Sequence, residues 1–209
     1  MTDFEAFDTR GYRTVDVRSG YGEWVTTYEQ TVEDAMDIHL LEGLRERGVE
    51  SIDGVDLTPE MLDVARAREV YASLVEADVS DTGLEPGAYD LVVTCLVDEH
   101  LADLRPLYAE ARRLARPGAI YVLVGFHPHF IMASGMPTHY DSASGEAVAI
   151  QTYVHLLSDH VSAGLAAGWT LVEMRERVID DAWLELKPKW ASLRDQPIAF
   201  AVAWRAPDA

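Results

Sequence analysis

Residues 54–62 read GVDLTPEML and join a short apolar strand to a capped helix. The strand is expected at 52–57, where the side chains are apolar enough for it. Thr58 then offers an N-cap hydroxyl, Pro59 suits the first helical position, and Glu60 matches the positive end of the helix dipole. The stretch therefore predicts one strand–helix unit of an α/β sheet.

The rest of the chain repeats this alternation. Further strands are expected at 74–77, 89–96, 119–125, 169–174 and 198–204, and helices at 31–44, after Pro59, at 104–114 and at 151–166. The last helix is expected to turn four side chains inward: Val154, Leu157, Val161 and Leu165. The order predicts a doubly wound α/β fold with a mostly parallel sheet, an antiparallel final strand and helices on both faces.

Charge and composition restrict the partners. The sequence carries 36 acidic and 17 basic side chains, a formal charge of −19. Such a surface repels phosphate backbones, which disfavours nucleic acid and favours a small-molecule substrate. No apolar run approaches the roughly 20 residues of a membrane helix, and the N-terminus lacks a signal-peptide pattern. The single cysteine, Cys95, cannot form an internal disulfide. We therefore expect no membrane partner and a cytoplasmic location.

Three strand ends carry residues that suit a ligand, because ligands of such sheets bind beyond the carboxyl ends of the strands. Asp56, followed by Leu57, can accept both ribose hydroxyls of a nucleoside; alternatively, it only helps to cap the next helix. Asp78 can accept from an adenine amino group while the Val79 N–H meets a ring nitrogen. The alternative for Asp78 is a solvated turn residue. Cys95 ends the most apolar strand, and its backbone would face the same ligand.

Taken in order, these segments resemble the conserved motifs of class I S-adenosylmethionine-dependent methyltransferases. The resemblance rests on GVDLTPEML (54–62), EADV (76–79), YDLVV (89–93) with LARPGA (114–119), and the lead-in GEWVTTY (22–28) of the small-molecule branch related to quinone C-methyltransferases. It extends from about residue 12 to 205 in motif order. It implies methyl transfer from S-adenosylmethionine to a small molecule, with S-adenosylhomocysteine as the product.

The resemblance also implies an N-terminal lid, residues 1–30, in which Tyr21, Trp24 and Tyr28 cover the cofactor. The alternative is that these rings only pack against a satellite of the core. Residues 127–146 are polar and rich in Gly, Pro and His, which predicts a long loop or cap. The expected organisation is one methyltransferase domain, 1–209, with a cap insertion at 127–150. A second copy of the chain, in a homodimer, is the one macromolecular partner considered.

One motif of this family is absent. The family holds the methionine part of the cofactor with a loop of the type DxGxGxG, roughly 20 residues before the acid that takes the ribose. Residues 36–39 contain no glycine, and the similar stretch VDVRSGYG (15–22) lies too far from Asp56. Leu44 and Arg45 look like two helix ends joined together. Our hypothesis is that about 25 residues, including the central first strand, are missing at this junction. The alternative is a degenerate, non-catalytic relative.

The acceptor side of the site is expected in the loop after the fifth strand. A base is needed only if the acceptor must lose a proton. His127 and His139 are the candidates, in a region that also holds His129 and Tyr140. Alternatively, each histidine is an ordinary hydrogen-bonding side chain. No acid is spaced among the histidines, so no metal site is expected.

For the other polar residues, structural roles are expected. Residues 98–100 (Asp-Glu-His) are expected only to start the next helix, and His155 and His160 to pack or to face solvent. The main alternative function is a binding or regulatory module that retains the fold without turnover. A nicotinamide oxidoreductase also uses an acid after its second strand, but Asp78 and the terminal pair of strands argue against it.

Overall fold

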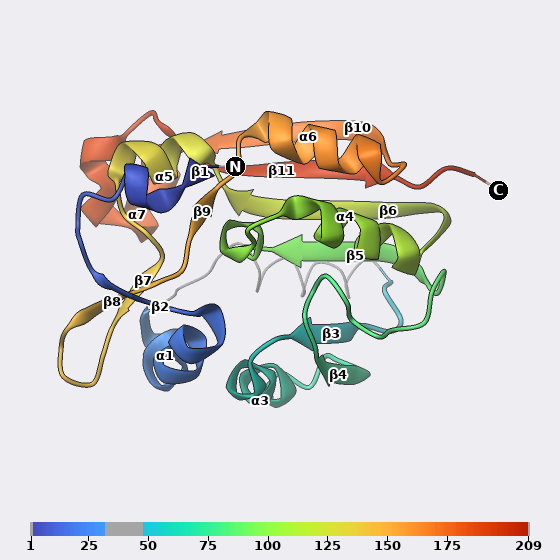
Figure 1. Cartoon of the computed structure of the whole chain (residues 1–209), viewed down its shortest axis with the longest axis horizontal. Helices are drawn as coiled ribbons and strands as arrows, with labels where there is room; N and C mark the ends of the chain where they lie inside the picture. The colour runs from blue at the N-terminus through green and yellow to red at the C-terminus, as the bar shows by residue number, and fades with distance from the viewer. Residues whose placement is uncertain (1, 32–47, 209) are drawn as a thin grey trace. The chain divides into compact units, whose positions relative to one another are not determined.

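The computed structural model describes residues 2–31 and 48–208, and the chain forms two compact units (Figure 1). Unit 1 consists of Met1–Gly11, Leu84–Thr138 and Thr152–Ala209, and unit 2 of Tyr12–Gly83 and His139–Gln151. The Leu44–Arg45 junction, with the missing strand inferred there, lies outside the described residues and stays a prediction. The single-domain organisation also stays a prediction.

Unit 1 is built on a four-stranded sheet in the order β10-β11-β6-β5 (Figure 1). The strands are β5 (Tyr89–Cys95), β6 (Ala115–Phe126), β10 (Thr170–Val178) and β11 (Pro197–Arg205). β5 and β6 are parallel, whereas β11 runs antiparallel to β6 and to β10. The α/β class and the antiparallel final strand are confirmed. The doubly wound arrangement over the whole chain stays a prediction.

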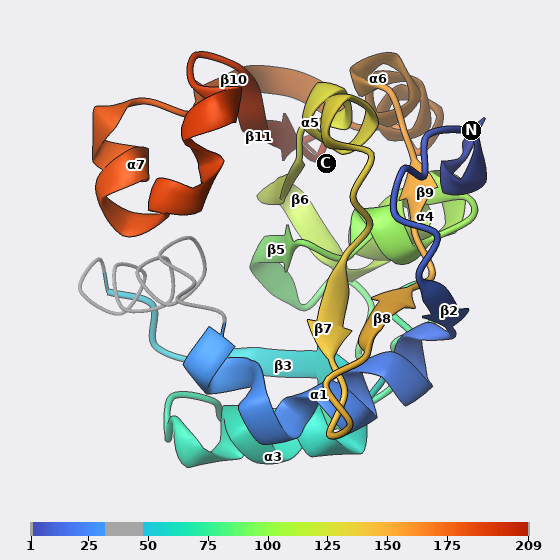
Figure 2. The ribbon, with the colours of Figure 1, turned by 90° about the vertical axis from the view of Figure 1, so that its left-hand side faces the viewer.

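Two helices of unit 1, α4 (Leu104–Leu114) and α6 (Leu157–Ala166), cover one face of this sheet (Figures 1 and 2). Beneath them lies an aromatic core, in which the Tyr108 ring meets Tyr121 edge-on at 5.5 Å and Trp204 at 5.7 Å. All three side chains are fully buried. The apolar side chains of α4 repeat every three or four residues, and for this reason its boundaries agree with those expected from the sequence.

Short elements surround this sheet in unit 1. β1 (Thr2–Asp3) pairs antiparallel with β9 (Tyr153–Val154). The others are η1 (Phe4–Ala6), η2 (Asp98–His100), α5 (Pro128–Ser134), α7 (Asp181–Leu186) and η3 (Pro188–Leu193). The turn η2 follows β5 directly and contacts β6 and β9. It therefore lies at the carboxyl end of the parallel pair, where a ligand is expected.

The inward face expected for α6 is right only in part. The helix begins at Leu157, six residues later than expected, and the buried Val154 belongs to β9. Leu165 is 57% exposed, whereas His160, Ala163 and Gly164 are buried. The reason is the closeness of β11, since a Cβ on Gly164 would stand 2.5 Å from the Trp204 ring. Small residues are therefore needed where the apolar period predicts leucine.

Unit 2 contains two small sheets. β3 (Asp53–Asp56) and β4 (Ser73–Glu76) form a parallel pair, and α3 (Pro59–Ala67) packs against both. In the second sheet β8 (Ala147–Ile150) lies between β2 (Arg13–Val15), to which it is parallel, and β7 (His139–Asp141), to which it is antiparallel. Helix α1 (Val17–Thr31) contacts α3 and β8.

Helix α1 was not expected: it ends at Thr31, where the sequence pattern suggested that a helix starts. Beyond Thr31 the expected helix 31–44 lies outside the described residues and stays a prediction. The stretch VDVRSGYG (15–22) is the start of α1 and not a glycine loop: Asp16 Oδ1 accepts from the Ser19 N–H at 2.9 Å, as an N-cap does. Gly20 is buried and packs closely on Ile150: a Cβ at this position would stand 2.7 Å from the Ile150 side chain.

The segment expected to be a long loop is also largely ordered into α5, β7 and β8. His127 caps α5 through its Nδ1, which accepts from the His129 N–H, and Pro128 takes the first helical position. This cap-and-proline signal was present in the sequence. The density of glycine, proline and histidine obscured it.

Candidate functional site

Asp56 ends β3 in unit 2, and its carboxylate is partly committed to the chain itself. Oδ1 accepts from the Thr58 N–H at 2.7 Å, while the Thr58 hydroxyl makes no cap bond. The expectation that Thr58 caps the helix with its side chain is therefore wrong, because the carboxylate two residues earlier is the stronger acceptor. The side chain of Thr58 also bonds to this carboxylate, so both the backbone and the hydroxyl of Thr58 engage the acid.

The environment of Asp56 differs from that of an ordinary surface acid. Burial raises the pKa of its carboxyl above the usual range, and the bond from Thr58 opposes the rise. Leu57 is half-buried beside it. A half-buried acid at a strand end is a more selective acceptor than a fully solvated one, since fewer waters compete for it.

Asp78 follows β4, whose carboxyl end lies beside that of β3 because the two strands are parallel. It is exposed, and its Oδ1 accepts from the Ser80 N–H at 2.8 Å and from the Ser80 hydroxyl at 2.6 Å. Val79 is half-buried. The structure thus brings Asp56 and Asp78 to one edge of the β3–β4 pair, and each carboxylate accepts from the residue two positions further along the chain.

Cys95 ends β5 in unit 1, and the residue after it has an unusual backbone. Leu96 has φ +54°, in the left-handed region that side chains with a Cβ rarely adopt. Its N–H donates to the Val124 carbonyl at 2.8 Å, which ties the turn to β6. Strained backbone of this kind persists where the surroundings hold it, and it clusters at functional sites.

The turn after β5 holds a buried acid, Glu99. Its side chain is 4% exposed, its Oε1 accepts from the Thr138 hydroxyl at 2.5 Å, and the same oxygen lies 3.5 Å from Nε2 of His100. Burial raises the pKa of Glu99 to about 8, and the bond from Thr138 opposes the rise. Glu99 was expected only to start a helix, yet it is a buried acid whose pKa is strongly raised.

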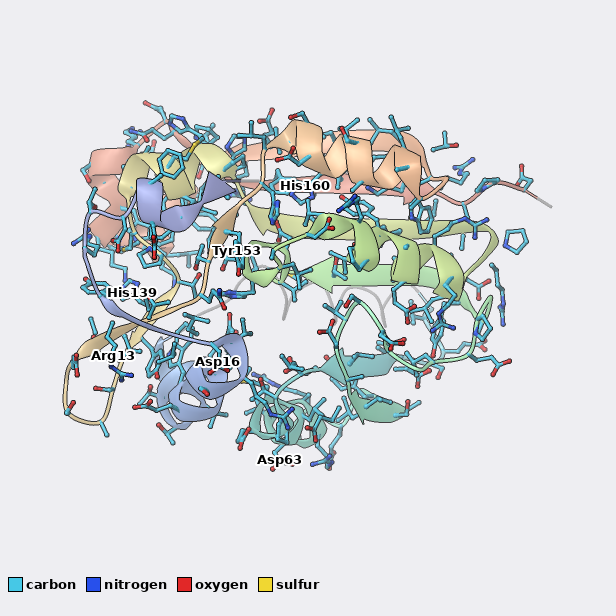
Figure 3. The ribbon with its side chains drawn as sticks, viewed as in Figure 1. Arg13, Asp16, Asp63, His139, Tyr153 and His160 are labelled. Carbon is cyan, nitrogen blue, oxygen red and sulfur yellow. The ribbon has the colours of Figure 1, made fainter. Side chains whose placement is uncertain are left out.

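Asp98, in the same turn, faces α6. Its Oδ2 lies 3.4 Å from Nε2 of His160, whose Nδ1 is 3.1 Å from the Tyr108 hydroxyl (Figure 3). Asp98 is 4% exposed and His160 is fully buried. Gly125 leaves the space that the carboxylate occupies, because a Cβ there would stand 2.7 Å from Oδ1.

His155 reaches the other end of that turn. Its Nε2 lies 2.6 Å from the Leu101 carbonyl, so this nitrogen carries the proton and donates it. Burial lowers the pKa of His155, which keeps the ring neutral. From the sequence, His155 and His160 were both expected to pack or to face solvent. Both are buried, and both contact the turn after β5.

The three lid candidates form one aromatic cluster on α1. Tyr21 stacks on Trp24 at 5.7 Å, and Tyr28 meets Trp24 edge-on at 5.1 Å. Trp24 also stacks on Tyr140 at 5.9 Å, which lies in a small core with Val148 and other β8 residues. The alternative reading, packing against a satellite core, describes these contacts directly. A role over the cofactor stays a prediction.

His127 lies in unit 1 and uses both ring nitrogens. Nδ1 caps α5, and Nε2 lies 2.7 Å from Oε1 of Glu176. Since Nδ1 is an acceptor here, Nε2 carries the proton and donates to the carboxylate. This arrangement gives His127 a structural role and leaves no lone pair for a substrate proton.

His139, the second candidate base, is half-buried in unit 2, and its ring lies 5.3 Å from that of Tyr12 (Figure 3). The next residue, Tyr140, donates to Oε2 of Glu23 at 2.8 Å. Burial, followed by this bond, raises the pKa of Tyr140 to about 12, so the phenol is a poor base. Of the two candidate histidines, His127 is the one that caps a helix.

Neither a cluster of metal ligands nor a membrane-spanning helix is found among the described residues. Over 2–31 and 48–208, no group of three or more His, Cys, Asp or Glu side chains is placed to hold a metal ion. Within the same ranges, no helix combines the length and apolar character needed to cross a membrane.

Part of the chain is similar in sequence to known methyltransferases. Residues 38–123 match the family model described as "Methyltransferase domain". A 76-residue stretch is 37% identical to the malonyl-[acyl-carrier protein] O-methyltransferase of Serratia marcescens, and covers 36% of this chain and 29% of that protein. The chain therefore spans less than a third of the length of this relative.

Solved structures resemble the chain over nearly its whole length. An S-adenosylmethionine-dependent methyltransferase from Mesorhizobium loti superposes with a TM-score of 0.62 at 20% identity, over 97% of this chain and 95% of that one. A second methyltransferase described in this way, from Listeria monocytogenes, gives 0.64 at 16% identity, over 91% and 99%. The fold is thus that of S-adenosylmethionine-dependent methyltransferases.

Proposed function

We propose that this chain transfers the methyl group of S-adenosylmethionine to a small-molecule acceptor and releases S-adenosylhomocysteine. The observation that carries the proposal is the pair of carboxylates, Asp56 and Asp78, at the carboxyl ends of the two parallel strands β3 and β4. The match of residues 38–123 to a methyltransferase domain supports it. The acidic composition favours a small acceptor over nucleic acid, and we place the protein in the cytoplasm.

The proposed cofactor contacts follow from the strand ends. Asp56 accepts from the ribose hydroxyls, with Leu57 beside it. Asp78 accepts from the adenine amino group, and the Val79 N–H donates to the ring. Cys95 offers backbone at the end of β5. The cofactor itself supplies an activated methyl group with a good leaving group, so these residues bind and orient it.

Tyr21, Trp24 and Tyr28 are proposed to exclude water from the cofactor, in addition to packing against β8. We propose His139 as the base for acceptors that must lose a proton, and give His127 the structural role described above. The Serratia relative is named for methylation of a malonyl-[acyl-carrier protein] oxygen. We propose instead a free small molecule of the kind implied by the quinone C-methyltransferase-like lead-in at residues 22–28.

Calorimetry with S-adenosylhomocysteine tests the proposal without knowledge of the acceptor. We expect saturable binding at a single site. A chain that gives no detectable heat at millimolar product would refute methyl transfer. Transfer of labelled methyl from S-adenosylmethionine to a panel of phenols, quinols and carboxylic acids then identifies the acceptor. Product binding without transfer to any of them would favour the alternative, a regulatory module without turnover.

A further inference from the structure

The turn after β5 combines backbone strain with two polar ties from one neighbouring segment. Leu96 holds φ +54° although it has a Cβ, and the chain then forms the short helix η2 and reaches Leu101. Two local backbone bonds form inside the turn, from the His100 N–H to the Val97 carbonyl and from the Leu101 N–H to the Asp98 carbonyl. At its start the Leu96 N–H donates to β6, and Thr138 donates to Glu99. Local bonds of this kind do not hold a left-handed leucine, so the neighbours of the turn must do so.

The first tie comes from His155, between β9 and α6. Its ring is 6% exposed, and its Nε2–H donates to the Leu101 carbonyl over 2.6 Å. The neutral state of the ring fixes this tautomer, because burial disfavours the charged form and the carbonyl requires a donor. A buried carbonyl that lost this donor would be left without a partner, at a cost greater than that of an exposed one.

The second tie comes from His160, which follows His155 by five residues and lies in α6. Its Nε2 lies 3.4 Å from Oδ2 of Asp98, and Tyr108 holds the ring through Nδ1. Among the described residues, neither Asp98 Oδ1 nor His160 Nε2 has a hydrogen-bond partner. The side chains packed around Asp98 and His160 therefore hold the two groups together. One of them is Phe200, whose ring centroid lies 4.8 Å from that of His160.

We propose that His155, with His160 as a second tie, is a positioning residue that holds the strained turn Leu96–Leu101 in the shape that receives S-adenosylmethionine. The inference rests on the proposed function, because the turn continues the strand that Cys95 ends and that would face the cofactor. His155 does not touch the ligand. It acts through the backbone of the turn.

A pair of substitutions at His155 separates the hydrogen bond from simple packing. His155→Gln carries an amide N–H near the position of Nε2 and keeps the bond to Leu101, whereas His155→Asn is too short to reach. Hydrogen exchange of the Leu96, His100 and Leu101 amides is measured without any ligand. We expect exchange at least about tenfold faster in His155→Asn, the equivalent of losing roughly one hydrogen bond, and near wild-type rates in His155→Gln.

Removing the strain tests the causal order. Leu96→Gly relieves the left-handed conformation, so in the double variant with His155→Asn the turn needs less support. We expect the double variant to regain most of the affinity for S-adenosylhomocysteine that His155→Asn loses. Glu69→Gly is the matched control, because Glu69 has φ +55° at an exposed site after α3. It should restore nothing.

The two readouts keep this inference apart from the proposed function. Unchanged exchange in His155→Asn overturns the inference, whatever the ligand does. Faster exchange with unaltered affinity for S-adenosylhomocysteine overturns the link between the turn and the cofactor. A wild-type chain that binds no S-adenosylhomocysteine overturns the proposed function, and with it the cofactor role of the turn. If His155→Asn does not fold, Asp98→Asn, which weakens the second tie at constant volume, is measured in the same way.

Discussion

Gly164 and Trp204 are in direct contact, and only a residue without a Cβ permits it. A Cβ on Gly164 would stand 2.5–2.8 Å from three carbons of the indole ring. Trp204 is fully buried and meets Tyr108 edge-on, so the ring has no room to move away. Helix α6 is therefore held against β11 at a separation set by this one position.

The first prediction concerns this contact. Gly164→Ala should destabilise the chain by about 2–3 kcal/mol, because overpacking against a rigid ring outweighs the gain in helix propensity. The adjacent Leu165→Ala is the control. Its side chain is 57% exposed, so its truncation should change stability by less than about 0.5 kcal/mol. Denaturant unfolding of both variants checks the ranking, and a larger effect at Leu165 would contradict the described face of α6.

The second prediction concerns Asp56. Asp56→Asn should weaken the affinity for S-adenosylhomocysteine by about 10- to 100-fold, since a charge-assisted bond becomes a neutral one. Asp63→Asn, on the exposed side of α3, should leave affinity unchanged. Because burial raises the pKa of Asp56, wild-type affinity should begin to fall at a higher pH than expected for an ordinary aspartate, as the sample is acidified. Equal affinities of the two variants would remove Asp56 from the site.

The third prediction uses the buried acid of η2. The folded-state pKa of Glu99 is about 8, above its unfolded value, so the native state retains a proton that the unfolded chain releases. The stability linked to this proton is fully present below about pH 4.5 and is lost as the pH rises through 8. Glu99→Gln, which keeps the acceptor for Thr138, should thus be more stable than wild type at pH 8, by roughly 1–3 kcal/mol.

The difference between Glu99→Gln and wild type should shrink towards zero near pH 5. Glu85→Gln, at an exposed site, is the control and should follow the wild-type curve at every pH. Urea unfolding at several pH values between 5 and 8 provides the test. A gap between the two curves that does not depend on pH would refute the assignment of the proton to Glu99.

The fourth prediction separates the two histidines after β6. If the acceptor must lose a proton, His139→Gln should lower kcat by about 10²- to 10⁴-fold and abolish the acidic limb of the pH–rate profile. His127→Gln should keep that limb, because its nitrogens already serve α5 and Glu176, and should cost about 1 kcal/mol of stability through the lost cap. Retention of the limb in His139→Gln would remove His139 as the base.

Much of the fold was predictable because its strands are short, apolar and separated by strong signals. Helix α4 was expected at its observed bounds, and β3, β5 and β11 within two residues. Helix α1 was missed because its period is masked by polar residues and glycines, and Asp16 was read as part of a loop motif. Local signals identify elements, but not which face of an element its neighbours will bury.

The candidate site was predictable only in part, for a related reason. Asp56 and Asp78 were expected at one edge because the ends of parallel strands meet there. The roles of His155 and Glu99 depend on which carbonyl and which hydroxyl the fold brings to them, and both partners are distant in sequence. The residues next to His155 and Glu99 in the sequence carry no signal that identifies such distant partners.

The parallel pairing of β2 with β8 has a consequence for how the protein is made. Arg13 pairs with Val148, which is synthesised 135 residues later (148 − 13). At about 5–20 residues per second, the N-terminal strand waits on the order of ten seconds before its ladder can close. During that interval its backbone groups are open to chaperones and to neighbouring nascent chains, so synthesis speed and chaperone supply should govern the yield of this unit more than its final stability does.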